Sequence, residues 1–275
     1  MVARVEGQQF YKMTGSGNDF VVFNATDGSV SHLENEDAIR SLSARGTGVG
    51  ADGVVFLEKS GEGDVRMRYY NSDGSEAALC GNASLCSTRL AVDLGIAQAG
   101  GFVLHTAAGS LKARIRDGLP EVDLEPVDDV KPDASDLGRR PGESRLGYAC
   151  AGVPHVVVEI SNIEAADVTG RGSELRNHPA LAEGANVNFV SRRPDGSFTY
   201  RTYERGVEGE TLACGTGVTA AALIFARLTG AASPVRVKVR GGDTLQVGFE
   251  TDGDGWKNVT LTGPADFVFE GEATL

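Results

Sequence analysis

One short pattern occurs twice in this chain of 275 residues and constrains its fold more than any other feature. Cys80 and Cys214 each lie four residues after a glutamate and directly before a glycine. A run of small and apolar residues follows each copy and predicts a helix that begins at the cysteine. The spacing of the two cysteines, 214 minus 80, is close to half of the chain. The sequence therefore predicts two similar halves, each with a thiol at the start of a helix.

The charge balance and the apolar pattern exclude several classes of partner. The chain carries 38 acidic and 26 basic residues, a formal net charge of −12. A surface for nucleic acid or anionic membrane would need clustered lysines and arginines, so neither partner is expected. No apolar run is long enough to span a membrane, and residues 1–7 lack the apolar core of a signal peptide. We therefore expect a cytoplasmic protein that acts on a small molecule.

The four cysteines do not indicate a disulfide framework or a metal site. Disulfide-rich folds belong to small secreted chains. The sequence contains neither CxxC nor HExxH, so we expect no metal. Cys86 lies inside the first predicted helix and Cys150 lies in a strand-like stretch, and both are expected to be core residues.

The order of predicted elements also indicates two halves. The predicted strands are 20–23, 54–57, 65–70, 102–105, 111–115 and 121–124, then 155–160, 187–190, 198–203, 235–239, 245–249 and 259–261. The predicted helices are 34–44, 80–94, a weak one at 174–182, and 215–228. The polar stretch 126–142 is punctuated by prolines and indicates the domain junction. Residues 218–226 are apolar nearly all round, which is typical of a helix enclosed by a sheet.

Two glycine-rich segments do not indicate a nucleotide site. Residues 48–53 match GxGxxG, but a helix is predicted before them and a strand after them. The dinucleotide fingerprint requires the opposite order, so a tight turn is the better interpretation. Residues 15–20 form another such turn, in which the Asn18 amide can both donate and accept a hydrogen bond. Taken alone, this segment is interpreted as a turn only.

The paired cysteines carry the strongest chemical signal. Backbone N–H groups at a helix N-terminus lower the pKa of a thiol there, and the same groups bind carboxylates. Cys80-Gly81-Asn82 and Cys214-Gly215-Thr216 can therefore each hold a substrate carboxylate and present a base to the neighbouring carbon. One isolated cysteine would be interpreted as core, but two in matching contexts favour a catalytic pair.

Three further residues indicate a functional role only when they are considered together with the two cysteines. His155 precedes an apolar strand, and Glu204 and Arg205 end a predicted strand ten residues before Cys214. Each alone is usually structural. Together, the histidine and glutamate could tune the thiols, and the arginine could bind a second carboxylate in a bidentate manner.

These motifs resemble those of the diaminopimelate epimerase family, amino-acid epimerases that use no cofactor. The resemblance covers nearly the whole chain. It rests on residues 17–20, 50–53, 71–76, 80–82, 154–155, 186–187, 204–206 and 209–217.

The resemblance implies an α+β fold of two pseudo-symmetric domains, each with a central helix wrapped by a mainly antiparallel, barrel-like sheet. The domains would be 1–126, completed by a C-terminal strand at 265–275, and 127–264, with the active site in the cleft between them. The implied activity interconverts LL- and meso-diaminopimelate by a two-cysteine proton transfer, in lysine and peptidoglycan precursor biosynthesis. No cofactor is implied. A homodimer is one expected assembly, although no residue pattern decides it.

The resemblance also implies residue roles. Cys80 and Cys214 would exchange the α-proton, with His155 and Glu204 assisting. The α-carboxylate would lie on the two helix N-termini. The substrate-binding residues would be Asn18, Asn71, Gly81, Asn82, Asn186, Glu204, Arg205, Gly215 and Thr216.

Several departures from the family pattern keep other functions open. Val153 replaces a common asparagine, Gly53 replaces a frequent glutamine, and 83–85 replace the usual Gly-Ala-Arg. One extra residue separates Glu204 from Cys214. The first two changes remove polar groups expected near the distal end of the substrate, so a racemase or epimerase of another amino acid is the alternative. An isomerase of the phenazine-biosynthesis type is a further alternative, but such enzymes lack the cysteine pair. A protein that only binds amino acids is another alternative, but binding alone needs no thiol in either half.

Overall fold

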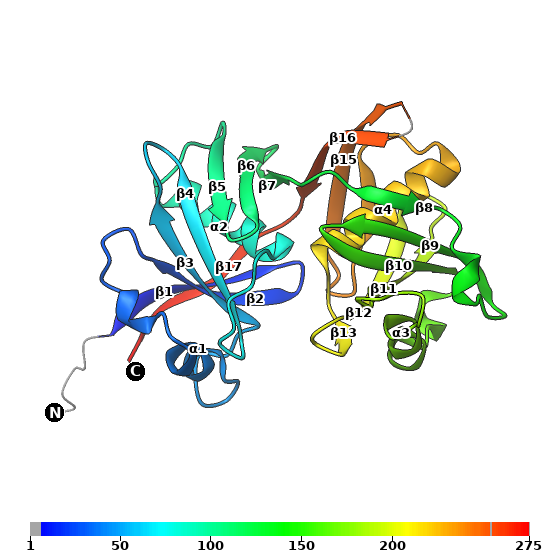
Figure 1. Cartoon of the computed structure of the whole chain (residues 1–275). Coiled ribbons are helices and arrows are strands. Elements are labelled where there is room, and N and C mark those ends of the chain that lie inside the picture. The colour runs from blue at the N-terminus through cyan, green and yellow to red at the C-terminus, as the bar shows by residue number, and fades with distance from the viewer. Residues whose placement is uncertain (1–6, 254, 275) are drawn as a thin grey trace. The chain divides into compact units, whose positions relative to one another are not determined.

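The computed structural model describes residues 7–253 and 255–274. The chain forms two compact units, one of Met1–Val122 with Pro264–Leu275 and one of Asp123–Gly263 (Figure 1). Residues 123–126, assigned from the sequence to the first domain, thus belong to the second unit. The expectation that the chain lacks an export signal falls mostly on residues 1–6, which lie outside the described residues.

The first unit is built on one sheet. Its strands are β1 Gln8–Gly15, β2 Asn18–Asn24, β3 Gly53–Lys59, β4 Val65–Asn71, β5 Phe102–Thr106, β6 Gly109–Arg116, β7 Leu119–Asp123 and β17 Asp266–Ala273. They pair in the order β17-β1-β2-β3-β4-β5-β6-β7. The pairs β2–β3 and β4–β5 are parallel and the others are antiparallel.

The second unit repeats this plan. Its strands are β8 Asp128–Lys131, β9 Glu143–Ala151, β10 Val153–Ile160, β11 Asn186–Arg192, β12 Phe198–Glu204, β13 Gly209–Thr211, β14 Val235–Lys238, β15 Thr244–Asp252 and β16 Gly255–Thr262. They pair in the order β8-β9-β10-β11-β12-β14-β15-β16, with β13 added beside β12. The parallel pairs, β10–β11 and β12–β14, occupy the same places as in the first unit. The predicted pseudo-symmetry and mainly antiparallel pairing are therefore confirmed.

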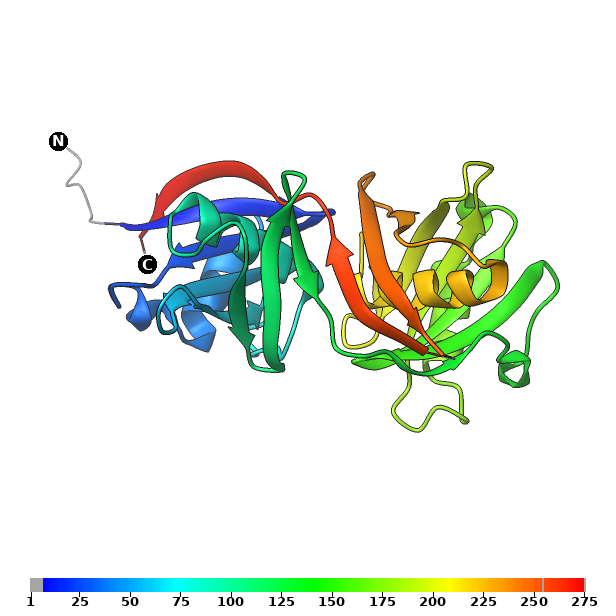
Figure 2. The same cartoon turned by 90° about the horizontal axis from the view of Figure 1, so that it is seen from above.

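Each unit encloses one helix. Helix α2, Gly81–Asp93, packs against β1, β2, β3, β4 and β6, and helix α4, Gly215–Thr229, packs against β8, β9, β10, β11, β14 and β15. In Figure 2 the gold helix α4 lies among the green and orange strands of its unit. Almost every residue from 215 to 226 is buried, as the apolar composition predicts. Gly230 ends α4 in the left-handed conformation, φ 68°.

A second helix in each unit packs on the other side of the sheet. Helix α1, Glu36–Ser43, begins at the capping residue Asn35 and buries Ile39 and Leu42, as predicted. Its counterpart α3, Val168–Arg176, packs on a cluster with β10, β11 and β12. Single 3-10 turns occur at Ser31–Leu33, Ser135–Leu137 and Ile163–Ala165.

The predicted position of the third helix, 174–182, is wrong. Helix α3 begins earlier because the Asp167 side chain caps it, accepting a hydrogen bond from the Gly170 amide at 2.9 Å. It ends at Arg176 because Pro179 lacks an N–H and disfavours helical geometry at the residue before it. Among the described residues, no helix is long and apolar enough to cross a membrane.

Candidate active site

Cys80 and Cys214 occupy the same position in the two units, directly before the central helix. Their backbones are nearly identical, with φ −137° and ψ 118° at Cys80 and φ −133° and ψ 112° at Cys214. The Cys80 carbonyl accepts the first helical hydrogen bond from the Ser84 amide at 2.9 Å, and the Cys214 carbonyl accepts from the Val218 amide at 2.8 Å. Both side chains are partly exposed, and neither caps its helix. Each unit thus presents a thiol beside the N–H groups of a helix start.

The helix starts are suited to a carboxylate. The first backbone N–H groups of an α-helix have no partner within the helix, and the macrodipole there favours negative charge. Gly81 and Gly215 are the first residues of α2 and α4, and Asn82 follows in the first turn. The Thr216 hydroxyl lies 3.5 Å from the Cys214 sulfur. A bound carboxylate would therefore lie next to a sulfur atom in either unit.

In the first unit, Asn18 and Asn82 are brought together by the turn between β1 and β2. Asn82 Nδ2 donates to Asn18 Oδ1 at 2.6 Å, and Asn18 Nδ2 donates to the Asp52 carboxylate at 3.0 Å. A carboxylate only accepts, so the orientation of the Asn18 amide is fixed. Among the described residues, Asn82 Oδ1 has no hydrogen-bond partner although Asn82 is only 1% exposed.

An ion-pair network surrounds Asp52, the hydrogen-bond partner of the Asn18 amide. Arg45 lies 2.8 Å from Asp52 and 2.6 Å from Asp19, and Lys12 lies 2.6 Å from Asp19. Burial alone would raise the pKa of Asp19, but hydrogen bonds from Arg45 and Lys12 hold that pKa below its usual value. Asp52 lies in the segment 50–53, which contributes to the family resemblance, but the sequence does not indicate that Asp52 contacts Asn18.

Asn71 ends β4, and its Nδ2 donates to the Ser75 hydroxyl at 3.1 Å. It pairs across the sheet with Gly53. A side chain at position 53 would place its Cβ 2.5 Å from the Tyr69 ring and from the Tyr70 carbonyl. The structure thus explains the glycine there, since Tyr69 fills the space that a larger residue would need.

In the second unit, the register of the sheet places the predicted polar residues on the face toward α4. His155 pairs with Asn186 in parallel strands, and Glu204 lies on β12, the next strand. The Asn186 Oδ1 accepts from the Arg205 amide at 2.8 Å, and Arg205 Nη1 donates to the Glu183 carbonyl at 3.0 Å. Glu204 accepts a short hydrogen bond from the Thr211 hydroxyl.

His155 is fully buried, with 0% of its surface exposed. Burial, and secondly the positive charge of Arg205, lower the pKa of His155 to about 3. The ring is therefore neutral near pH 7. Its Nδ1 lies 3.3 Å from Nδ2 of Asn188, a residue that the sequence analysis did not select. The alternation in Asn186-Val187-Asn188 could have indicated it, because residues two apart on a strand share a face.

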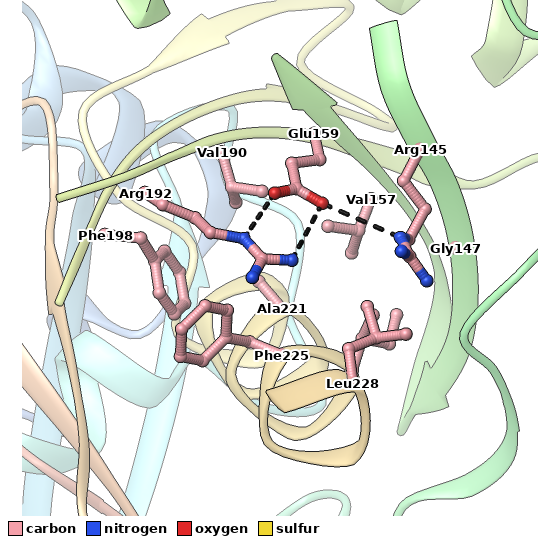
Figure 3. Close-up of a pocket in the computed structure, with 11 residues that line it drawn as sticks. Arg145, Gly147, Val157, Glu159, Val190, Arg192, Phe198, Ala221, Phe225 and Leu228 are labelled. Carbon is pink, nitrogen blue, oxygen red and sulfur yellow. Dashed lines mark hydrogen bonds and ion pairs between the residues drawn. The ribbon is translucent and has the colours of Figure 1, made fainter. Parts of the chain in front are cut away.

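The pocket in Figure 3 is not part of this site. It lies against the later turns of α4, where Ala221, Phe225 and Leu228 form its floor. Glu159 lies opposite α4 and pairs with Arg192 at 3.2 Å and Arg145 at 3.7 Å. Its volume of about 20 Å³ is enough for about one water molecule and excludes an amino acid.

The two other cysteines differ in environment. Cys86 is buried in α2, as expected, and burial raises its pKa. The expectation that Cys150 is a core residue is wrong, since it is partly exposed beside a hollow of about 490 Å³. It pairs with Pro154 across β9 and β10 and so faces away from His155.

Known structures share this fold. A phenazine biosynthesis protein of the PhzF family from Bacillus anthracis superposes with a TM-score of 0.74, covering 98% of this chain and 100% of its own, at 14% identity. A hydroxyproline epimerase from Agrobacterium vitis superposes with a TM-score of 0.66, covering 98% of this chain and 93% of its own, at 22% identity. At these identities the likeness shows the fold alone.

Sequence relatives are much closer. The diaminopimelate epimerase of Gemmatimonas aurantiaca is 46% identical, over 96% of this chain and 98% of the relative, and that of Aquifex aeolicus is 39% identical, over 96% of each. The family model for diaminopimelate epimerase matches residues 10–128 and 147–268. The chain is therefore an isomerase of the racemase and epimerase class. Within that class it belongs to the diaminopimelate epimerase family.

Proposed function

We propose that the chain interconverts LL- and meso-diaminopimelate without a cofactor, with one of Cys80 and Cys214 removing the α-proton and the other returning a proton to the α-carbon. The observation that carries this is the matching backbone of the two cysteines at the starts of α2 and α4. The reaction would serve lysine and peptidoglycan precursor synthesis in the cytoplasm.

The chemistry needs one thiolate and one thiol. The thiolate takes the α-proton from one face of the substrate and becomes a thiol, and the electron pair stays on the α-carbon. The other thiol returns a proton to the opposite face and becomes a thiolate. Backbone N–H groups of Gly81, Asn82, Gly215 and Thr216 would bind the α-carboxylate and stabilise the charge that develops beside it.

The remaining polar residues would hold the distal end of the substrate. We assign this role to Asn18, Asn71, Asn186 and Arg205, with Glu204 contributing to binding and, like His155, to proton transfer. Asn18 Oδ1 and Asn186 Oδ1 already accept hydrogen bonds within the protein. Asn18 Nδ2 also donates to Asp52, so one N–H group of Asn18 would be left for a distal carboxylate, and Asn186 would offer its Nδ2 group.

A second candidate is an epimerase or racemase of another amino acid. The Tyr69 ring fills the space beside Gly53, and the Val153 side chain cannot form a hydrogen bond, so two distal polar groups of the family pattern are missing. A panel of amino acids, followed by loss of optical rotation, separates the two candidates. Faster turnover of a monocarboxylic amino acid than of LL-diaminopimelate would favour the second.

The test of the two-cysteine mechanism compares Cys80→Ala and Cys214→Ala with wild type on LL-diaminopimelate in deuterated water. We expect each variant to lose about 10²–10⁴-fold in epimerisation rate, because each lacks one of the two proton-transfer groups. Cys86→Ala is the matched control, since this buried thiol lies in the helix that begins directly after Cys80. Wild-type rates in either active-site variant would refute the mechanism.

We also propose a homodimer. Strand β17 lies at the edge of its sheet, yet Phe267, Val268 and Phe269 on it are 42%, 55% and 48% exposed. An apolar sheet edge tends to associate unless another chain covers it, and a second copy would do so. Light scattering at micromolar concentration measures the mass directly, and a monomer would contradict this proposal.

A further inference from the structure

Four buried polar side chains form a connected group beneath the start of α4. His155, Asn188, Tyr200 and Thr202 are each at most 1% exposed. Asn188 of β11 lies directly opposite Thr202 of β12, and His155 of β10 pairs with the residue two positions before Asn188. The strands therefore place all four on one face of the sheet, where apolar side chains would be expected.

The orientation of the Asn188 amide is fixed by partners of known polarity. Its Nδ2 donates to the Val156 carbonyl at 3.0 Å, and a carbonyl oxygen can only accept. Its Oδ1 accepts from the Tyr200 hydroxyl at 2.6 Å and from the Thr202 hydroxyl at 3.1 Å. A flipped amide would lose the hydrogen bond to Val156, so the nitrogen end is the one that faces His155.

This orientation decides where the proton of His155 lies. Asn188 Nδ2 is 3.3 Å from His155 Nδ1, and an amide NH₂ group donates but does not accept. Nδ1 must therefore be the unprotonated nitrogen, which places the proton of the neutral ring on Nε2. A doubly protonated ring would set two N–H groups against each other. Among the described residues, Nε2 is buried and has no hydrogen-bond partner.

The same group also contacts the start of α4. The Tyr200 hydroxyl lies 3.4 Å from the Cys214 carbonyl oxygen. A Cβ atom at Gly217 would lie 2.3 Å from both Asn188 Oδ1 and the Tyr200 hydroxyl. The first turn of α4 thus rests directly on Asn188 and Tyr200, which connect it to His155.

We propose that Asn188 is a positioning residue that keeps the ring proton of His155 on Nε2 and, together with Tyr200, seats the helix start that carries Cys214. This inference rests on the proposed function, since it gives His155 a role in the reaction. That role is to donate a hydrogen bond from Nε2 toward the reacting centre. His155 would thus assist proton transfer as a hydrogen-bond donor and would not itself accept the proton.

The first experiment measures the ring nitrogens of ¹⁵N-histidine-labelled protein by NMR without substrate, between pH 5 and 8. The chain has four histidines, and His155→Gln assigns the signal of the buried one. We expect an unprotonated Nδ1 and a protonated Nε2 throughout this range. A proton on Nδ1, or titration of the ring within the range, would overturn the proposal.

Two variants of Asn188 then test whether this residue orients the His155 ring or only contributes to packing. Asn188→Asp offers an acceptor in place of the NH₂ group, so Nδ1 of His155 should become protonated. Asn188→Leu removes the hydrogen bonds, and kcat should fall on the order of a hundredfold with KM little changed. Ser191→Ala, on the same strand with its hydroxyl bonded to the Ser161 carbonyl at 3.0 Å, should change neither the tautomer nor kcat.

The outcomes also separate this inference from the proposed function. If Asn188→Leu leaves both the tautomer and kcat as in wild type, the positioning role is refuted. If either variant does not fold, the wild-type tautomer alone decides whether Asn188 orients the ring. A wild-type protein with the expected tautomer that does not epimerise diaminopimelate would refute the proposed function instead.

Discussion

The orientation of a candidate site side chain can be set by a single neighbouring group that only accepts or only donates a hydrogen bond. Asp52 fixes the Asn18 amide, and Asn188 fixes the His155 ring. The sequence indicated Asn18 and His155, because a turn and a motif surround them. It did not indicate Asp52 or Asn188 as partners, because each meets its neighbour only when strands more than thirty positions apart pair in the sheet.

At the same scale, the buried neutral His155 predicts a dependence of stability on pH. Its pKa is about 3 in the folded protein against 6.5 ordinarily, so between these values the unfolded chain binds one more proton. Its contribution to stability is complete above pH 6.5 and is lost as the pH falls toward 3. From pH 7 to pH 5, the free energy of unfolding should fall by about 2 kcal/mol more in wild type than in His155→Gln.

Urea unfolding at the two pH values checks this difference. His32→Gln, which replaces an exposed histidine of the first unit, should behave as wild type. An equal fall in wild type and His155→Gln would show that His155 is not held neutral.

At the scale of elements, the helices that carry the cysteines were predicted correctly and other elements were not. Helices α2 and α4 have strong local signals, namely a run of small and apolar residues and a glycine at the end. Strand β1, which was not predicted, contains several polar residues and is held by its neighbours β2 and β17. A local sequence pattern identifies an element when the element's own apolar residues account for its burial. A strand such as β1 is stabilised mainly by the strands beside it, which the local sequence does not reveal.

Gly217 gives an unusual prediction for a helix. Replacement of a helical glycine by alanine normally stabilises by about 1 kcal/mol, because alanine has the higher helix propensity. Here the added Cβ would lie 2.3 Å from Asn188 Oδ1 and from the Tyr200 hydroxyl. We therefore expect Gly217→Ala to lower the melting temperature and kcat. Calorimetry and the epimerisation assay measure both.

A comparison with Tyr200→Phe tests the cause. Removing the hydroxyl should relieve part of the clash, so Gly217→Ala should cost less in the Tyr200→Phe background than in wild type. Additive losses would mean that the glycine matters for another reason.

At the scale of the whole molecule, the two units have the same strand arrangement, but one strand of the first unit, β17, comes from the C-terminal part of the chain. Strand β17 pairs with β1 as β8 pairs with β9, so the C-terminal strand fills in the first unit the place that β8 fills in the second. The Tyr11 and Phe267 rings, and those of Phe10 and Phe269, make edge contacts across this pair. The first unit is therefore completed only after residues 266–273 have been made.

Deletion of residues 264–275 should loosen the first unit alone. Strand β1 would lose its antiparallel partner and the aromatic contacts. We expect amides of α2 to exchange with solvent at least about tenfold faster, and amides of α4 to exchange as before. Hydrogen exchange by mass spectrometry resolves the two helices. Equal loss of protection in both would mean that the two units do not unfold separately.

The sequence by itself determined the two-part organisation, the thiols at two helix starts and the family. These follow from local properties, namely the spacing of apolar residues, the chemistry of a helix N-terminus and short motifs in a fixed order. Only the tertiary structure decided the orientation of the Asn18 and Asn188 amides, the proton position on His155, and the filling of the space beside Gly53 by Tyr69. Those features depend on which distant strands become neighbours, because a buried polar group is fixed by the partners that enclose it.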